Sequence, residues 1–170
     1  METTDILIKI RKIVRSINLE SKKIQKEYGV SIPQILCLNF LHTSPNYQAT
    51  QGEIKKFLNL NSSTISGIIN RLEKKGHLAR LPKSGDKRVV NIALTSAGDK
   101  LLNEIPSLLH EQLIEKLNKL NPGKVSQIEE GLEILIKLLN IQNVDASPLL
   151  TIEDNIEDNI TNDKAHKKQH

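Results

Sequence analysis

The hydrophobic pattern changes at Gly76, and this change constrains the fold more than any other feature of the chain. Before Gly76, apolar residues recur at helical spacing in two short segments, 50–58 and 61–76, which are separated only by Asn59-Leu60-Asn61. After it, residues 78–81 and 89–94 show the pattern of β-strands and flank a basic, glycine-containing tip at 82–88. The pattern predicts a helix-turn-helix followed by a β-hairpin, which is a winged helix.

A long amphipathic helix is expected before this lobe, over residues 5–27. Gly29 stands where a helix C-terminal cap belongs. A second helix is expected to begin at Ser31, which is spaced from Gln34 as in a capping box, and to end near His42.

Two more helices are expected after the lobe. Thr95 is predicted to cap a long helix over 95–120, and Asn121 followed by Pro122 is predicted to begin a last helix that ends near Asn140. The predicted fold class is therefore mainly α with a small β-hairpin wing, a winged helix-turn-helix lobe between long N- and C-terminal helices.

The outer helices carry more leucine and isoleucine than one small lobe can cover, and the simplest partner is a second copy in a two-fold dimer. We expect a dimerisation helix at 1–30, the winged lobe at 31–95 and dimerisation helices at 96–140. Residues 141–170, with a tandem Ile-Glu-Asp-Asn repeat, are expected to be a disordered tail. The residues predicted at the dimer interface are Ile6, Ile10, Ile13, Ile17, Leu117, Leu120, Leu132, Leu135 and Leu139.

Composition narrows the class of protein. The chain has 170 residues, an aliphatic core with few aromatic residues, and a single cysteine, Cys37, so no intramolecular disulfide can form. No apolar run approaches the roughly 18 residues of a membrane span, and the N-terminus does not resemble a signal peptide. We expect a soluble, cytoplasmic protein with no membrane partner.

Basic charge is concentrated in and near the winged lobe. Residues 50–90 hold nine lysines and arginines against three acidic residues, whereas 141–170 hold three against six. Short polar side chains crowd the exposed side of the helix at 61–76, and its N-terminus offers free backbone amides. A basic surface with such groups is typical of a protein that binds a nucleic acid.

The ordered motifs in this region resemble the MarR family of transcriptional regulators. They are Gln51-Gly-Glu-Ile54, Asn61-Ser-Ser-Thr-Ile-Ser66, Arg71-Leu-Glu-Lys-Lys-Gly76, Asp86-Lys-Arg88 and Leu94-Thr-Ser-Ala-Gly98. The resemblance covers about residues 34–105. It implies a triangular homodimer that represses transcription at a pseudo-palindromic, double-stranded DNA operator and is released by a small-molecule effector or by oxidation.

The helix at 61–76 would then enter the major groove and the wing at 82–90 the minor groove. Arg88 resembles the minor-groove arginine of the family, and Asp86 would orient its guanidinium. Ser63, Thr64, Ser66 and Asn70 would face base edges, with Asn61, Ser62 and Arg71 near phosphates. The residues predicted to contact DNA are Asn61, Ser62, Ser63, Thr64, Ser66, Asn70, Arg71, Lys83, Ser84, Asp86, Lys87 and Arg88.

The sequence disfavours several other functions. Cys37 lies in an apolar segment, which favours a core cysteine over a reactive thiol, and the spacing of His42, His77 and His110 does not favour a metal sensor. No catalytic motif is present, so we expect no enzyme activity, no catalytic residues and no cofactor or metal. A winged helix that contacts proteins without binding DNA is an alternative, but it predicts an apolar or acidic face on the helix at 61–76.

Overall fold

The computed structural model describes residues 3–82, 85 and 88–151, which form two compact units. The first unit includes the described residues up to Pro106, and the second is Ser107–Leu150. The elements of the first unit are α1 (Thr3–Tyr28), α2 (Ile32–Thr43), a short 3-10 helix (Pro45–Tyr47), β1 (Gln48–Thr50), α3 (Gln51–Leu58), α4 (Ser62–Lys74), β2 (Leu78–Arg80), β3 (Asn91–Leu94) and α5 (Ser96–Glu104). The second unit has α6 (Leu109–Asn118) and α7 (Pro122–Leu138). The mainly helical, winged fold is as predicted.

The helix starts follow the side-chain caps expected from the sequence. At α2, Ser31 Oγ accepts from the Gln34 amide at 3.3 Å and Gln34 Oε1 accepts from the Ser31 amide at 3.2 Å. At α3, Thr50 and Glu53 form the same reciprocal pair. Hydrogen bonds from the Thr50 amide and then its hydroxyl hold the pKa of Glu53 below its ordinary value.

The sheet has three antiparallel strands in the order β1-β3-β2. The hairpin of β2 and β3 was predicted, and Leu78 pairs with Leu94 in its register. Strand β1 was not predicted, because three residues carry too little periodicity to be recognised. The predicted strand at 89–94 is shorter in the structure, since β3 begins only at Asn91.

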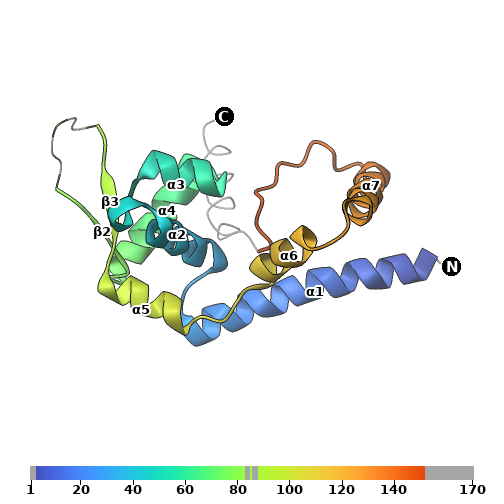
Figure 1. Cartoon of the computed structure of the whole chain (residues 1–170), viewed down its shortest axis with the longest axis horizontal. Helices are drawn as coiled ribbons and strands as arrows, with labels where there is room; N and C mark the ends of the chain where they lie inside the picture. Colours follow the sequence, from blue (N-terminus) through green and yellow to red (C-terminus); the bar gives the residue numbers. More distant parts are fainter. Residues whose placement is uncertain (1–2, 83–84, 86–87, 152–170) are drawn as a thin grey trace, which may run out of the picture. The chain divides into compact units, whose positions relative to one another are not determined.

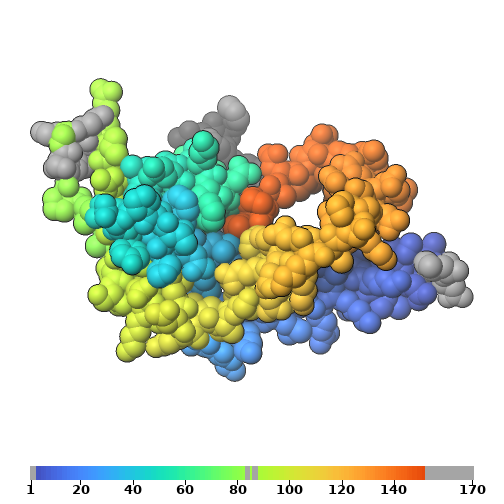
Figure 2. Space-filling model, in the orientation of Figure 1, coloured from blue at the N-terminus to red at the C-terminus, as the bar shows by residue number. Residues whose placement is uncertain are grey.

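The core of the first unit is built around α2, which packs against α3, α4, α5 and β3. Figure 1 shows α2, α3 and α4 grouped beside the hairpin, and Figure 2 shows the face of this lobe where residues of β1 and α3 (cyan) reach the surface. The largest fully buried side chains are Ile32, Ile35, Leu38, Leu41, Ile54, Leu58, Ile65, Ile68, Ile69, Leu72, Leu78 and Ile92. All are aliphatic, and burying each contributes about 1.5–3 kcal/mol.

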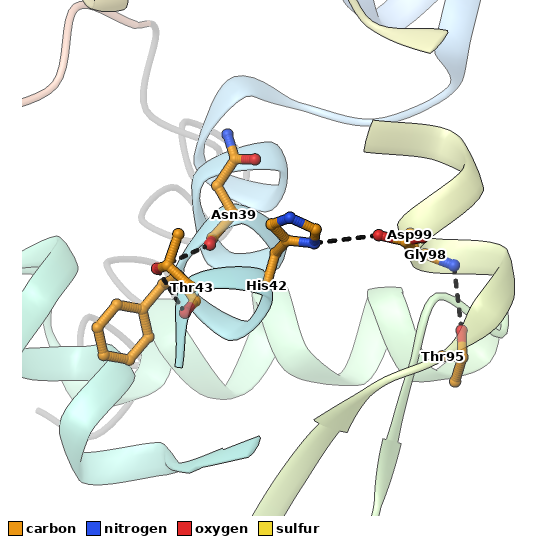
Figure 3. A network of polar contacts seen from close by, with 7 residues as sticks. Asn39, His42, Thr43, Thr95, Gly98 and Asp99 are labelled. Atoms are coloured by element: carbon orange, nitrogen blue, oxygen red, sulfur yellow. Dashed lines mark hydrogen bonds and ion pairs between the residues drawn. The ribbon is translucent and has the colours of Figure 1, made fainter. Parts of the chain in front are cut away.

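Polar contacts attach the start of α5 to the rest of the lobe (Figure 3). Thr95 Oγ1 accepts from the Gly98 amide at 3.1 Å and donates to the Gly76 carbonyl at 2.6 Å. His42 Nδ1 on α2 lies 3.0 Å from Asp99 Oδ1 on α5. The predicted cap at Thr95 is thereby confirmed. Its bond to Gly76 also attaches α5 to the chain just after α4.

The prediction of one continuous helix over 95–120 was wrong. Helix α5 ends at Glu104, and α6 begins only at Leu109. Between them Ile105 is extended, with φ −82° and ψ 129°. Proline disfavours the helical conformation of the residue before it, so Pro106 ends α5 at this point.

The second unit contains two amphipathic helices. Asn121 Oδ1 accepts from the Gly123 amide at 2.8 Å, and Pro122 is the first residue of α7, as predicted. From Ile141 to Leu150 the chain forms no helix or strand. Among the described residues, no helix combines the length and the apolar character needed to cross a membrane.

Candidate nucleic-acid interface

Helix α4 is positioned by the short link from α3. Asn59 adopts the left-handed conformation, with φ 51° and ψ 45°, and its amide donates to the Lys55 carbonyl. Asn61 then caps α4, because its Oδ1 accepts from the Thr64 amide at 2.8 Å. The link therefore ends one helix and begins the next within three residues.

Two opposite faces of α4 have different chemistry. Its buried face is aliphatic and consists of Ile65, Ile68, Ile69 and Leu72. The opposite side carries Ser63, Gly67, Asn70 and Lys74, which share one stripe at helical spacing. We call these four residues the outer stripe of α4. Three of them have polar side chains, and the fourth is glycine.

The first turn of α4 is held by its own polar groups and by α3. Ser63 Oγ donates to Asn61 Oδ1 at 2.9 Å, so the capping residue also orients this serine. Ser62 Oγ accepts from Lys55 Nζ at 2.8 Å, which brings a cation from α3 to the N-terminus of α4. The structure thus brings together Asn61, Ser62 and Ser63, three of the residues predicted to contact DNA, with Lys55 beside them.

Two of the residues predicted to face base edges are engaged within the fold. Ser66 is half-buried and its Oγ accepts from Gln51 Nε2 on α3 at 2.9 Å. Asn70 is exposed, and its Oδ1 accepts from Arg80 Nη2 on β2 at 2.7 Å. Ser66 therefore helps to fix the angle between α3 and α4, whereas Asn70 lies on the outer stripe.

Arg71 occupies space that Gly67 leaves open. A Cβ at residue 67 would lie 3.4 Å from Arg71 Nη2, so the guanidinium folds back over the glycine. The space above Gly67 therefore borders the Arg71 side chain.

Most of the wing tip lies outside the described residues. This applies to Lys83, Ser84, Asp86 and Lys87, so the expected pairing of Asp86 with Arg88 stays a prediction. Arg88 is described and exposed.

Four contacts at α4 were missed from the sequence. Lys55, Gln51 and Arg80 touch α4 as given above, and Lys75 Nζ donates to the Gly29 carbonyl at the end of α1. Lys55 had been counted in the basic excess, and Arg80 was placed on the same strand face as Leu78, since residues two apart on a strand point to the same side. Neither pattern says which helix a long side chain will reach.

The predicted dimer-interface residues are not buried in the chain. Ile6, Ile13, Leu120, Leu132 and Leu139 are exposed, and Ile10, Ile17, Leu117 and Leu135 are half-buried. Their contact with a second copy stays a prediction.

The residues considered for a thiol or metal sensor lie in surroundings that do not favour those roles. Cys37 is fully buried, and this burial raises the pKa of its thiol to about 12. Burial first, and the charge of Lys75 second, lower the pKa of His77 from its ordinary value. Within the part of the chain that the structure describes, no three His, Cys, Asp or Glu side chains gather as a metal site would require.

Comparison with known proteins agrees with this geometry. Residues 30–90 match the model of the MarR family. The uncharacterized HTH-type transcriptional regulator YsmB of Bacillus subtilis (strain 168) is 26% identical over 75% of this chain and 86% of its own. The multiple antibiotic resistance protein MarR of Escherichia coli (strain K12) is 32% identical over 47% of this chain and 56% of its own.

A solved structure shares the fold. It is the MepR–DNA complex of Staphylococcus aureus, with a TM-score of 0.58 and 23% identity, covering 82% of this chain and 99% of MepR. The family match over 30–90 and the curated relatives place the chain among regulators of transcription and not among enzymes. Residues 30–90 of the chain therefore belong to the MarR family of winged helix-turn-helix transcriptional regulators.

Proposed function

We propose that two copies of this chain bind a pseudo-palindromic DNA operator, with α4 of each copy in the major groove and the wing at 82–90 in the minor groove. The observation that carries the proposal is the outer stripe of α4, whose Ser63, Asn70 and Lys74 are polar and exposed and lie opposite a fully aliphatic buried face. An apolar or acidic stripe would suit a protein partner instead. Ser63 and Asn70 supply the short hydrogen-bonding groups that read base edges.

Phosphate contacts are expected around this stripe. Lys55 lies at the N-terminus of α4, where backbone amides also favour an anion, and Lys74 belongs to the outer stripe itself. Arg71, folded over Gly67, lies near enough to the stripe to reach a phosphate beside it. The wing residues Lys83, Ser84, Asp86, Lys87 and Arg88 complete the proposed contact set.

The homodimer is supported by the exposed apolar side chains of α1 and α7. A monomer would leave Ile6, Ile13, Leu132 and Leu139 in water. A two-fold dimer would cover them and would hold two copies of α4 about 34 Å apart, the length of one duplex turn. MepR, which shares the fold, has been solved with DNA.

Release from DNA is proposed to depend on that spacing. A small-molecule effector that changes the distance between the two α4 helices would weaken binding at both half-sites together. The aliphatic composition of the chain gives no preference for an aromatic effector. A thiol switch is disfavoured by the burial of Cys37.

The test is fluorescence anisotropy of the full chain with the DNA that flanks its own gene and with a shuffled duplex. We expect tighter binding to the flanking DNA and a steep fall of affinity as salt rises. Ser63→Asp, which places a negative charge on the outer stripe, should weaken binding by about tenfold or more. Ser126→Asp, the same change on exposed α7, is the matched control and should leave affinity unchanged.

Equal affinity for both duplexes would contradict the proposal. Binding that does not respond to salt would favour the protein-contact alternative, and so would an unchanged affinity of Ser63→Asp.

A further inference from the structure

We infer that Arg80 selects the base that Asn70 reads, by engaging the amide oxygen of Asn70 so that the amide NH2 is the group offered to the groove. The inference rests on the proposed insertion of α4 into the major groove. It assigns to Arg80, a residue of strand β2, a role in base preference without direct contact with a base. Arg80 is therefore a positioning residue.

Three contacts fix Arg80 against α4. Its Nη2 donates to Asn70 Oδ1 at 2.7 Å, and its Nη1 lies 3.0 Å from Glu73 Oε2. The backbone amide of Arg80 also donates to Glu73 Oε2 at 3.3 Å. Since β2 packs against α4, the strand fixes the backbone of Arg80 while Asn70 and Glu73 hold its guanidinium.

The chemistry of the guanidinium decides how the Asn70 amide is turned. A guanidinium has only donors, so the amide must direct its oxygen toward Arg80. The two Nδ2 hydrogens then point to the other side of the side chain. Asn70 is exposed and lies on the outer stripe between Ser63 and Lys74, so these hydrogens are available to a molecule bound there.

This orientation changes which base Asn70 can recognise. The usual pairing of asparagine with adenine needs both groups of the amide, because adenine offers one acceptor and one donor in the major groove. Guanine offers two acceptors, N7 and O6, and no donor. An asparagine whose oxygen is already bonded to a cation presents donors, and it should therefore prefer guanine over adenine.

The charge of Arg80 acts in the same direction. The positive guanidinium beside Asn70 Oδ1 repels the amino group of adenine and attracts the acceptor-rich edge of guanine. Glu73 offsets part of this charge, but its carboxylate contacts Nη1 of Arg80, whereas Nη2 is the nitrogen that contacts Asn70. Arg80 therefore disfavours adenine by occupying the oxygen and by its charge.

A simpler role for the same contacts is a brace between β2 and α4. The two roles make different predictions. A brace lowers stability or lowers affinity for every DNA sequence alike, whereas a positioning residue changes which base is preferred at one position of each half-site.

The experiment measures affinity of the full-length protein for its operator and for every single base-pair substitution of one half-site. Four proteins are compared: wild type, Asn70→Ala, Arg80→Ala and Arg80→Lys. Asn70→Ala should remove the base preference at one position, where the wild type prefers guanine over adenine by about tenfold. At that position Arg80→Ala should reverse or abolish the preference for guanine, and the profile at other positions should stay the same.

Arg80→Lys keeps a charge and a donor but loses the fixed fork of the guanidinium, so it should show an intermediate profile. It also keeps the test usable if Arg80→Ala fails to fold, which a thermal melt of each variant reports. A preference for adenine at the Asn70 position of the wild type would overturn the inference. So would an Arg80 variant that lowers affinity equally for all duplexes.

The proposed function and this inference fail in distinguishable ways. If the wild type shows no sequence preference at all, DNA recognition by α4 is wrong. If the wild type has a base profile that Asn70→Ala leaves unchanged, only the inference is wrong.

Discussion

Gly98 lies directly against the backbone of His77, and a Cβ at residue 98 would overlap the His77 carbonyl oxygen. The same Cβ would come within 2.7 Å of Leu94 Cδ1. That carbonyl also accepts from the Thr95 amide at 3.2 Å, so the first turn of α5 is fixed against the segment between α4 and β2. Backbone cannot move aside as a flexible side chain can.

Gly98→Ala should therefore destabilise the lobe. Overpacking of this kind costs about 1–3 kcal/mol, measured as the change in free energy of unfolding in urea. Gly52→Ala is the control, because a Cβ there meets only Thr50 Oγ1 at 3.9 Å. We expect it to be neutral or slightly stabilising, since alanine favours a helix. Equal stability of the two variants would contradict the close approach of Gly98.

Thr95→Ala should also lower stability. It removes the hydroxyl that accepts from the Gly98 amide and donates to the Gly76 carbonyl. Loss of such a cap costs about 1 kcal/mol, and the second hydrogen bond adds to this. Thr95→Ser keeps the hydroxyl and should retain most of the stability. Chemical denaturation of both variants checks the difference, and an equal loss in both would assign the effect to the methyl group.

The Cys37 thiol should be inert in the folded protein. Because burial raises its pKa from 9.0 to about 12, the fraction of thiolate near neutral pH falls by about three orders of magnitude. A disulfide reagent at pH 8 should react slowly with the native protein and rapidly in urea. Similar rates in both conditions would show that the thiol is accessible and would reopen a sensing role.

The same shift gives a dependence of stability on pH. The folded pKa lies above the unfolded one, so the contribution of Cys37 is fully present below about pH 9 and is lost as pH rises toward 12. Cys37→Ala should remove this component of alkaline destabilisation, which denaturation at pH 8 and pH 10.5 measures.

Arg88→Ala should weaken operator binding without changing the fold. The loss of one arginine from a groove costs about 1–3 kcal/mol of binding free energy. A gel-shift titration at fixed salt measures it, with a thermal melt as the check on folding. An unchanged affinity would refute the role assigned to the wing.

Leu132→Asp should disrupt the proposed homodimer. Leu132 is 53% exposed on α7, and in a dimer interface a carboxylate at this position would be buried without a partner. Size exclusion with light scattering should show a shift from dimer to monomer. Ser126→Asp adds the same charge on the other side of α7 and should leave the mass unchanged. A monomeric wild type would refute the dimer itself.

Local interactions made much of the fold predictable. Ser31, Thr50, Thr95 and Asn121 mark helix starts because each cap is decided within three residues of the sequence. The helix-turn-helix and the hairpin were predictable because their periods differ and glycine or asparagine separates them.

The errors arose where a local signal was outweighed or absent. The regular apolar spacing over 95–120 concealed the break at Pro106. A proline disfavours the helical conformation of the residue before it, so the break could have been predicted at Ile105. Strand β1 exists because Gln48 and Thr50 pair with β3, some forty residues later, and such a partner cannot be read from three residues. The hydrogen bond from Arg80 to Asn70 likewise depends on the packing of β2 against α4, which a local pattern does not reveal.

The bond from Lys75 to the Gly29 carbonyl connects the end of α4 to the last turn of α1. Gly29 has φ +69°, so it sets the direction in which the helix leaves the lobe. An α-helix of 26 residues is about 39 Å long, and a 5° tilt at Gly29 would move its far end by about 3 Å. A small change of angle at Gly29, next to its contact with Lys75, would therefore produce a displacement of several ångströms at the N-terminal end of α1.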